Sequence, residues 1–199
     1  MLLACAFQAG GAEAVPDASM FARQTGTSAL RGNLRFSSTR TPVGGASDGL
    51  SWTHGPNSDW DGTWMEGPLS SVQASAVDYR VAAYGEGGNG WNIVVGIANA
   101  GSSMEGNNAY MNMWGWVGGT GHVLQKPPSK SEQAPACGDN LPKISADEDI
   151  MRVVYDPAAR TLSFALNSEA PRLGCQDIPA GEYVFALATA QSGMQIRLD

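Results

Sequence analysis

The chain has 199 residues, 43% hydrophobic and only 16% charged, which is enough for one well-buried core and short for two. Its formal net charge is −7 and its 12 basic residues are scattered, whereas nucleic acids and anionic membranes are bound by clustered Lys and Arg. Neither is therefore expected as a partner. The sequence has no apolar run long enough to span a membrane and no Asn-x-Ser/Thr sequon, and we expect a cytoplasmic or otherwise intracellular protein.

Glycine and proline punctuate the whole sequence. The 25 glycines and 11 prolines recur between short apolar runs. After Met20, no window of a dozen residues keeps a helical spacing of apolar residues that is free of both. Helix is therefore expected to be scarce, and the pattern predicts an all-β protein built as a two-layer antiparallel β-sandwich.

The first part of the chain gives few structural signals. Residues 1–28 are small and polar with no clear period, which predicts a flexible N-terminal tail before a single domain spanning residues 29–199. Candidate early strands surround Leu34 and Trp52. The strand predicted over residues 72–84 has a clearer basis, because apolar and polar side chains alternate from Val77 onward as they do on a half-buried strand.

The middle of the chain is richer in apolar residues. Residues 91–98 are apolar on both faces, which predicts a central strand whose outer side is covered by a second layer or a long loop. The aromatic, glycine-punctuated segment 110–117 is expected to pair with residues 121–124. Residues 126–148 hold four prolines and few apolar residues, so we expect one long surface loop there.

The C-terminal part gives the clearest pattern. An apolar run, an Asp-Pro turn signal and a period of two in the residues that follow predict a β-hairpin over residues 149–167. A lone hairpin cannot bury its apolar face, so it must belong to a larger antiparallel sheet. Two closing strands are predicted over residues 183–188 and 194–198. Aromatic residues at strand positions are expected in the core: Trp91, Tyr155, Phe164, Tyr183 and Phe185.

The motifs that could carry chemistry have simpler structural interpretations. The glycine-rich segment 85–90 fits a dinucleotide-binding pattern, but a strand follows it instead of the helix that would hold a pyrophosphate, so we interpret it as a hairpin loop. Asp59 and Asp61 lack the further ligands of a calcium loop, and residues 147–149 are interpreted as a solvated acidic turn. The two histidines stand beside no recognisable nucleophile. We therefore expect no enzyme, no cofactor and no bound metal.

The cysteines leave one question open. The chain has three of them, Cys5, Cys137 and Cys175, and their spacing is unlike that of metal ligands. Since connectivity cannot be deduced from sequence alone, the sequence leaves open whether Cys137 and Cys175 form a disulfide, and it does not favour the bond.

Several segments occur in an order that is typical of one known family. They are Val77 to Tyr84 leading into Trp91 to Ala98, the Trp-Gly-Trp segment and glycine turn over 114–122, Asp147 to Ile150, the hairpin ending at Asn167, and the strands at 183–187 and 195–198. Together they resemble the SPRY domain family over residues 67–199. Ala146 and Ser168 stand where the family usually has glycine, and both positions lie in expected turns rather than in the core.

The resemblance implies a bent sandwich of two antiparallel sheets that binds proteins or peptides through loops at one end, without catalysis. The loops expected to do so are 84–89, 104–114 and 125–137. They carry aromatic and amide side chains of the kind that make adaptable recognition surfaces. The candidate partner-binding residues within or beside them are Tyr84, Asn89, Asn108, Tyr110 and Trp114.

A lectin-like carbohydrate-binding domain is the alternative function. Six tryptophans, adjacent asparagines at 107–108 and the loop 59–62 would suit the stacking of sugars on a sandwich fold. The aromatic residues next to expected loops can lie on the surface or fill corners of the core, and the sequence leaves both positions open for Trp60, Trp64, Tyr84, Tyr110 and Trp114.

Overall fold

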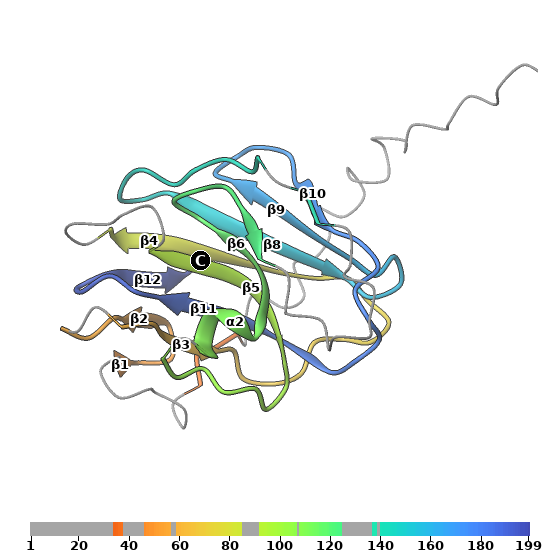
Figure 1. Ribbon diagram of the computed structural model, residues 1–199, viewed down its shortest axis with the longest axis horizontal. Helices are drawn as coiled ribbons and strands as arrows, with labels where there is room; N and C mark the ends of the chain where they lie inside the picture. The colour runs from red at the N-terminus through yellow and green to blue at the C-terminus, as the bar shows by residue number, and fades with distance from the viewer. Residues whose placement is uncertain are drawn as a thin grey trace, which may run out of the picture.

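The computed structural model folds the chain into two antiparallel β-sheets that pack against each other (Figure 1). It describes residues 34–37, 46–56, 59–84, 92–106, 108–124, 137–138 and 140–199. The predicted tail 1–28, the predicted hairpin loop 85–90 and Trp91 lie outside the described residues. The all-β, two-layer antiparallel sandwich predicted from the sequence is confirmed.

One layer is a seven-stranded sheet. Its strands, in spatial order, are β1 (Ala46–Ser47), β2 (Ser51–Thr53), β12 (Gln195–Leu198), β4 (Ser75–Ala83), β8 (Ile150–Asp156), β9 (Thr161–Leu166) and β10 (Arg172–Cys175). The predicted hairpin is the pair of β8 and β9, which reverses after Asp156. Because β12 pairs with both β2 and β4, the last strand of the chain joins its early and middle parts.

The other layer is a five-stranded sheet. Its order is β3 (Asp61–Trp64), β11 (Tyr183–Thr189), β5 (Ile93–Asn99), β6 (Met113–Val117) and β7 (Val123–Leu124). The strand predicted over residues 91–98 is β5, and it is central because β11 and β6 pair with its two edges. A short helix, α2 (Asn108–Met111), precedes β6.

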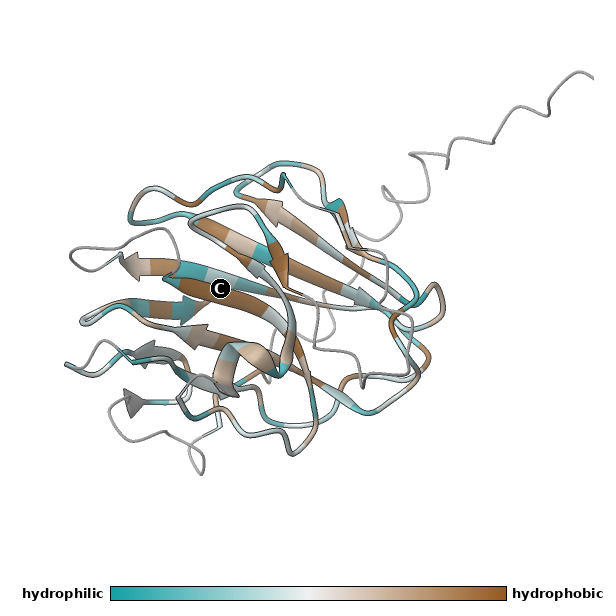
Figure 2. Ribbon diagram, viewed as in Figure 1, coloured by the Kyte–Doolittle hydropathy of each residue, from teal (hydrophilic) through white to brown (hydrophobic). Residues whose placement is uncertain are grey.

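The main core lies between the sheets. Alternate residues of β8 are buried, which is the burial pattern of a strand with one dry face. The predicted core aromatics within the described residues are confirmed, since Tyr155, Phe164, Tyr183 and Phe185 are all buried. Figure 2 shows the hydrophobic residues concentrated along the strands, with hydrophilic residues more common in the turns that connect them.

A second apolar cluster covers the outer face of the five-stranded sheet. Its members include Trp64, Met104 and Ala109, together with the outward-facing side chains of β5, β6 and β11. Both faces of β5 are therefore buried, as its unbroken apolar sequence predicts. The residues that precede β6 form part of this cover, and α2 lies in front of the sheet in Figure 1.

Three local expectations differ from the structure. The segment 110–117 begins as the last turn of α2 and becomes a strand only at Met113, since its first residues cover the sheet rather than extend it. The predicted surface loop 126–148 contains two core residues, Leu141 and Ile144, whose backbone N–H groups bond to the turn after β6. Asp61, considered above as a loop residue, begins β3 and is buried.

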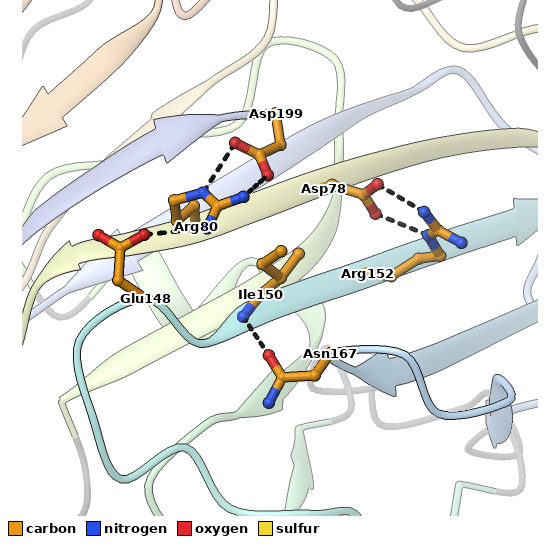
Figure 3. A network of polar contacts seen from close by, with 7 residues as sticks. All are labelled: Asp78, Arg80, Glu148, Ile150, Arg152, Asn167 and Asp199. Carbon is orange, nitrogen blue, oxygen red and sulfur yellow. Dashed lines mark hydrogen bonds and ion pairs between the residues drawn. The ribbon is translucent and has the colours of Figure 1, made fainter.

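The outer face of the seven-stranded sheet carries charged side chains that pair across strands (Figure 3). Arg152 of β8 donates two hydrogen bonds to Asp78 of β4, at 2.7 and 2.6 Å. Arg80, also on β4, pairs with Glu148 at 2.9 Å and with Asp199 after β12. These contacts link β12, β4, β8 and the turn that enters β8, and they fix the register of the middle of the sheet.

A disulfide joins Cys137 to Cys175, which closes the question that the sequence leaves open. Cys175 is the last residue of β10, and Gly138 donates a backbone hydrogen bond to Gly174 at 2.7 Å. The bond spans 38 residues of chain and attaches the end of the segment that follows β7 to the edge of the other sheet.

Removing this disulfide is expected to destabilise the domain. A closed loop of this length restricts the unfolded chain and corresponds to about 4 kcal/mol in the chain-entropy model. The double variant Cys137→Ser/Cys175→Ser should therefore unfold at a clearly lower urea concentration than the parent. Cys5→Ser, which leaves the bond intact, is the control. Equal midpoints for the parent and the double variant would contradict the assigned role of the bond.

Candidate functional site

The two tyrosines predicted to bind a partner belong to different layers of the sandwich. Tyr84 directly follows β4, is partly exposed, and packs against the core between the sheets. Tyr110 lies in α2, is also partly exposed, and packs against the outer cluster of the five-stranded sheet. The predicted site therefore divides into two regions with separate supports.

The other three candidates have different positions. Asn89 lies outside the described residues, and Asn108 is the first residue of α2. Trp114 is in β6 and only 5% exposed, and its ring meets the edge of Tyr183 with 5.5 Å between centroids. Burial raises the pKa of the Tyr183 hydroxyl to about 12, and this hydroxyl donates a hydrogen bond to the carbonyl of Pro179 at 2.6 Å. Trp114 is thus part of a neutral, well-packed interior.

A pair of aromatic rings, Trp60 and Tyr110, stands beside the outer face of the five-stranded sheet. We call this pair the aromatic corner. The ring centroids are 4.6 Å apart and the planes are tilted by 48°. Both side chains are partly exposed and both pack against the outer cluster. Met111, next in the helix, is 46% exposed and adds apolar surface. The corner thus combines a base packed on the sheet with two partly exposed aromatic side chains.

The corner is fixed by the close approach of α2 to β3. Gly62 donates a backbone hydrogen bond to Met104 at 3.0 Å, which joins the segment before α2 to the edge of β3. A Cβ atom at Gly62 would come within 2.7 Å of the Leu187 carbonyl oxygen on β11, 2.8 Å of the end of the Met104 side chain and 3.2 Å of Ala109. Glycine is therefore required at this position for β11 and the residues of α2 to lie this close to β3.

The segments that form the corner carry negative charge only. Residues 59–64 and 103–112 contain Asp59, Asp61 and Glu105 and no Lys or Arg. Asp61 is buried and forms an isolated bridge with Glu105, while Asp59 and Glu105 are exposed. The exposed carboxylates give the surroundings of the rings a negative potential.

The acidic turn near Tyr84 has a structural role. Asp147 accepts a hydrogen bond from the backbone N–H of Tyr84 at 2.6 Å, and Glu148 pairs with Arg80. Asp149 accepts two backbone hydrogen bonds, from Ser145 at 3.0 Å and from the next residue at 3.3 Å. Each carboxylate of the turn is thus engaged by groups of the protein, and the turn holds Tyr84 at the end of β4.

A buried polar cluster lies between β2 and β11. The indole N–H of Trp52 donates to the hydroxyl of Thr189 at 3.1 Å, and Nδ1 of His54 lies 2.9 Å from the same oxygen. His54 is only 2% exposed, so its ring is out of reach of a substrate. Within the described ranges, no three His, Cys, Asp or Glu side chains gather as a metal site would require.

Sequence reasoning identified Tyr110 but did not pair it with Trp60. The two residues are far apart in sequence, and their contact depends on the helical turn that the sequence pattern did not indicate. The available signal was the Asp-Trp-Asp-Gly run, in which an aromatic residue stands between two carboxylates.

The fold is similar to those of solved SPRY domains. The SPRY domain of human HERC1 matches with a TM-score of 0.63 and 18% identity, over 82% of this chain and 96% of that one. The PSpry domain of TRIM65 has a TM-score of 0.57, 13% identity and coverage of 84% and 92%. A human SPRY domain has a TM-score of 0.56, 14% identity and coverage of 77% and 93%. The protein therefore has a SPRY-like fold.

The sequence itself is more distant. No protein-family model matches the chain, and no curated protein matches it by sequence. No helix within the described residues is long and apolar enough to cross a membrane.

Truncation of Trp114 and of Tyr110 is expected to have different effects on the stability of the domain. Trp114→Ala removes a buried ring and should lower the free energy of unfolding by about 3–5 kcal/mol. Tyr110→Ala removes a partly exposed ring and should cost about 1 kcal/mol. Urea denaturation of both variants measures the difference. A Trp114 variant as stable as the Tyr110 variant would show that Trp114 is not part of the core.

Substitution at Gly62 is expected to displace the residues that support the aromatic corner. Gly62→Ala places a methyl group against the Leu187 carbonyl oxygen, Met104 and Ala109, and overpacking of this kind costs about 1–3 kcal/mol. Displacement of α2 should also change the near-ultraviolet circular dichroism, because Trp60 and Tyr110 lose their fixed contact. Gly101→Ala is the control, since no atom lies within 4 Å of a Cβ there. The control carries backbone strain only, at φ 89°, so equal spectra for both variants would contradict the packing role of Gly62.

Proposed function

We propose that this domain is a non-catalytic interaction module that binds a peptide or a protein surface through loops outside the strands. The SPRY-like fold supports this proposal most strongly, because SPRY domains are generally interaction modules. The partly exposed aromatic residues held on fixed elements give further support, since aromatic anchors supply much of the binding energy at protein interfaces.

Two surface regions are proposed to contribute. One surrounds Tyr84, with Asn89 in the segment that follows. The other is the aromatic corner, with Asn108 at the start of its helix. Trp114, the remaining candidate, lies on the strand that α2 leads into, but its ring packs in the core between the sheets, so we assign it to the support of the fold. Rigid supports reduce the entropy lost on binding and therefore favour affinity.

Carbohydrate binding is the competing function. The tilted rings of Trp60 and Tyr110 are the observation that favours it, because sugars also bind to exposed aromatic faces. Oligosaccharides therefore belong in the binding experiment as competitors.

The setting of the protein is a separate part of the proposal. The intracellular location expected from the sequence stays a prediction, and the disulfide between Cys137 and Cys175 weighs against a reducing compartment. Trapping of free thiols in freshly lysed cells would distinguish a reducing compartment from an oxidising one. After denaturation, a cytoplasmic protein would show three reactive cysteines, whereas an exported protein would show Cys137 and Cys175 protected from the reagent.

A peptide-display selection on the purified protein tests the proposed function. We expect enrichment of a shared peptide motif on the parent protein. Either Tyr84→Ala or Tyr110→Ala should weaken the selected peptide about tenfold or more, because truncation of an interface anchor commonly costs 2 kcal/mol or more. The affected variant identifies which of the two regions is the binding face.

The control is Val72→Ala, which shortens a side chain that is 76% exposed and lies in neither region. Failure to enrich any peptide, or enrichment that oligosaccharides abolish, would overturn the proposal in favour of carbohydrate binding or of a purely structural role.

A further inference from the structure

We infer that the aromatic corner binds a cationic side chain, Lys or Arg, of a basic peptide segment. The inference rests on the proposed function and specifies the chemistry of its partner. Three observations carry it, namely the geometry of the two rings, the carboxylates beside them and the partial exposure of both aromatic side chains.

The rings offer a π surface of suitable shape. With centroids 4.6 Å apart and planes tilted by 48°, Trp60 and Tyr110 form two walls that meet at an angle rather than a flat stack. A cation placed near such walls is attracted by the electron-rich faces, and tryptophan is the best of the aromatic residues for this contact. The remaining described tryptophans are buried, so Trp60 is the partly exposed indole of the described chain.

The charges near the rings favour a cation over other ligands. Asp59 immediately precedes Trp60, and Glu105 faces β3 across the bridge to Asp61. Within the described part of the chain, the side chains of Asp59 and Glu105 make no ion pair or hydrogen bond, so both carboxylates are available to a ligand. Their exposure distinguishes the corner from the region around Tyr84, where Asp147 and Glu148 are already engaged.

The surface near the corner includes residues that leave room for a ligand. Gly106, which follows Glu105, has no atom within 4 Å of the position that its Cβ would occupy. Its φ is 55°, a conformation that favours glycine. Met111 adds exposed apolar surface on the helix, where the aliphatic part of a Lys or Arg side chain could pack. An extended peptide with spaced basic residues therefore fits the chemistry of this surface.

The test measures binding of defined peptides to the full chain. The probes are a peptide of alternating Arg and Gly and its counterpart with Gln in place of Arg. We expect the Arg peptide to bind about tenfold or more tightly, with an affinity that falls as salt is added, because the contacts are electrostatic. Tyr110→Ala should weaken the Arg peptide about fivefold or more, whereas Tyr110→Phe should retain it, because the ring remains.

Neutralisation of the carboxylates provides the second arm. Asp59→Asn/Glu105→Gln should weaken the Arg peptide about fivefold at low salt and reduce the salt dependence. The matched control is Asp177→Asn/Glu182→Gln, which changes the net charge equally at two exposed positions between β10 and β11. It should leave binding within about twofold of the parent. Thermal melting of each variant confirms that the fold is retained.

Each other outcome overturns the inference in a distinct way. Equal binding of the Gln and Arg peptides would exclude cation recognition, and equal effects of the two neutralised variants would assign any attraction to net charge alone. If display selects peptides that contain no Lys or Arg and still depend on Tyr110, the proposed function stands. The inference that the corner binds a cationic side chain would then be refuted. Tyr110-dependent binding of an oligosaccharide, without binding of the Arg peptide, would refute both.

Discussion

The burial of both faces of the five-stranded sheet is the constraint on which the rest of the structure depends. The strand β5 is apolar on each side, so one face needs the seven-stranded sheet and the other needs a separate cover. The residues between β5 and β6 contribute to that cover by pairing with the edge of β3 and then crossing the sheet as α2. A connection between neighbouring strands thereby becomes part of the hydrophobic packing, and its exposed side carries Tyr110 in a fixed position.

This arrangement explains why recognition residues stand on a well-ordered base. The backbone of α2 cannot move away from β3 without exposing Met104 and Ala109. The close contacts at Gly62 leave no space between the helix and the strand. Tyr84 is held differently, by the hydrogen bond of its N–H to Asp147 and by the ion pairs of the same turn. Hydrophobic packing thus orients one region and polar contacts orient the other, so that added salt acts on them unequally.

The sequence predicted those parts of the fold whose residues alternate or form long apolar runs. It located β4, β5, β8, β9, β11 and β12, because their patterns reflect one or two buried faces directly. It missed β3 and β10, which are short and contain glycine or charged residues, and it missed α2, whose four residues are too few for a helical period. The candidate site was predicted only in part. The sequence selected Tyr84 and Tyr110, but it could not distinguish them from Trp114, whose burial depends on the long-range contact with Tyr183.

The disulfide has a consequence for association as well as for folding. The strand β10 is at the edge of the seven-stranded sheet, and Cys137 and Gly138 occupy its outer side through a backbone bridge. Unpaired strand edges invite pairing between molecules, and proteins commonly block them with a short covering segment. When the bond is reduced, only the backbone contacts retain this cover, and Leu173 already presents an exposed apolar side chain on the same strand. The disulfide therefore keeps the edge of β10 covered and reduces edge-to-edge aggregation of the sheet.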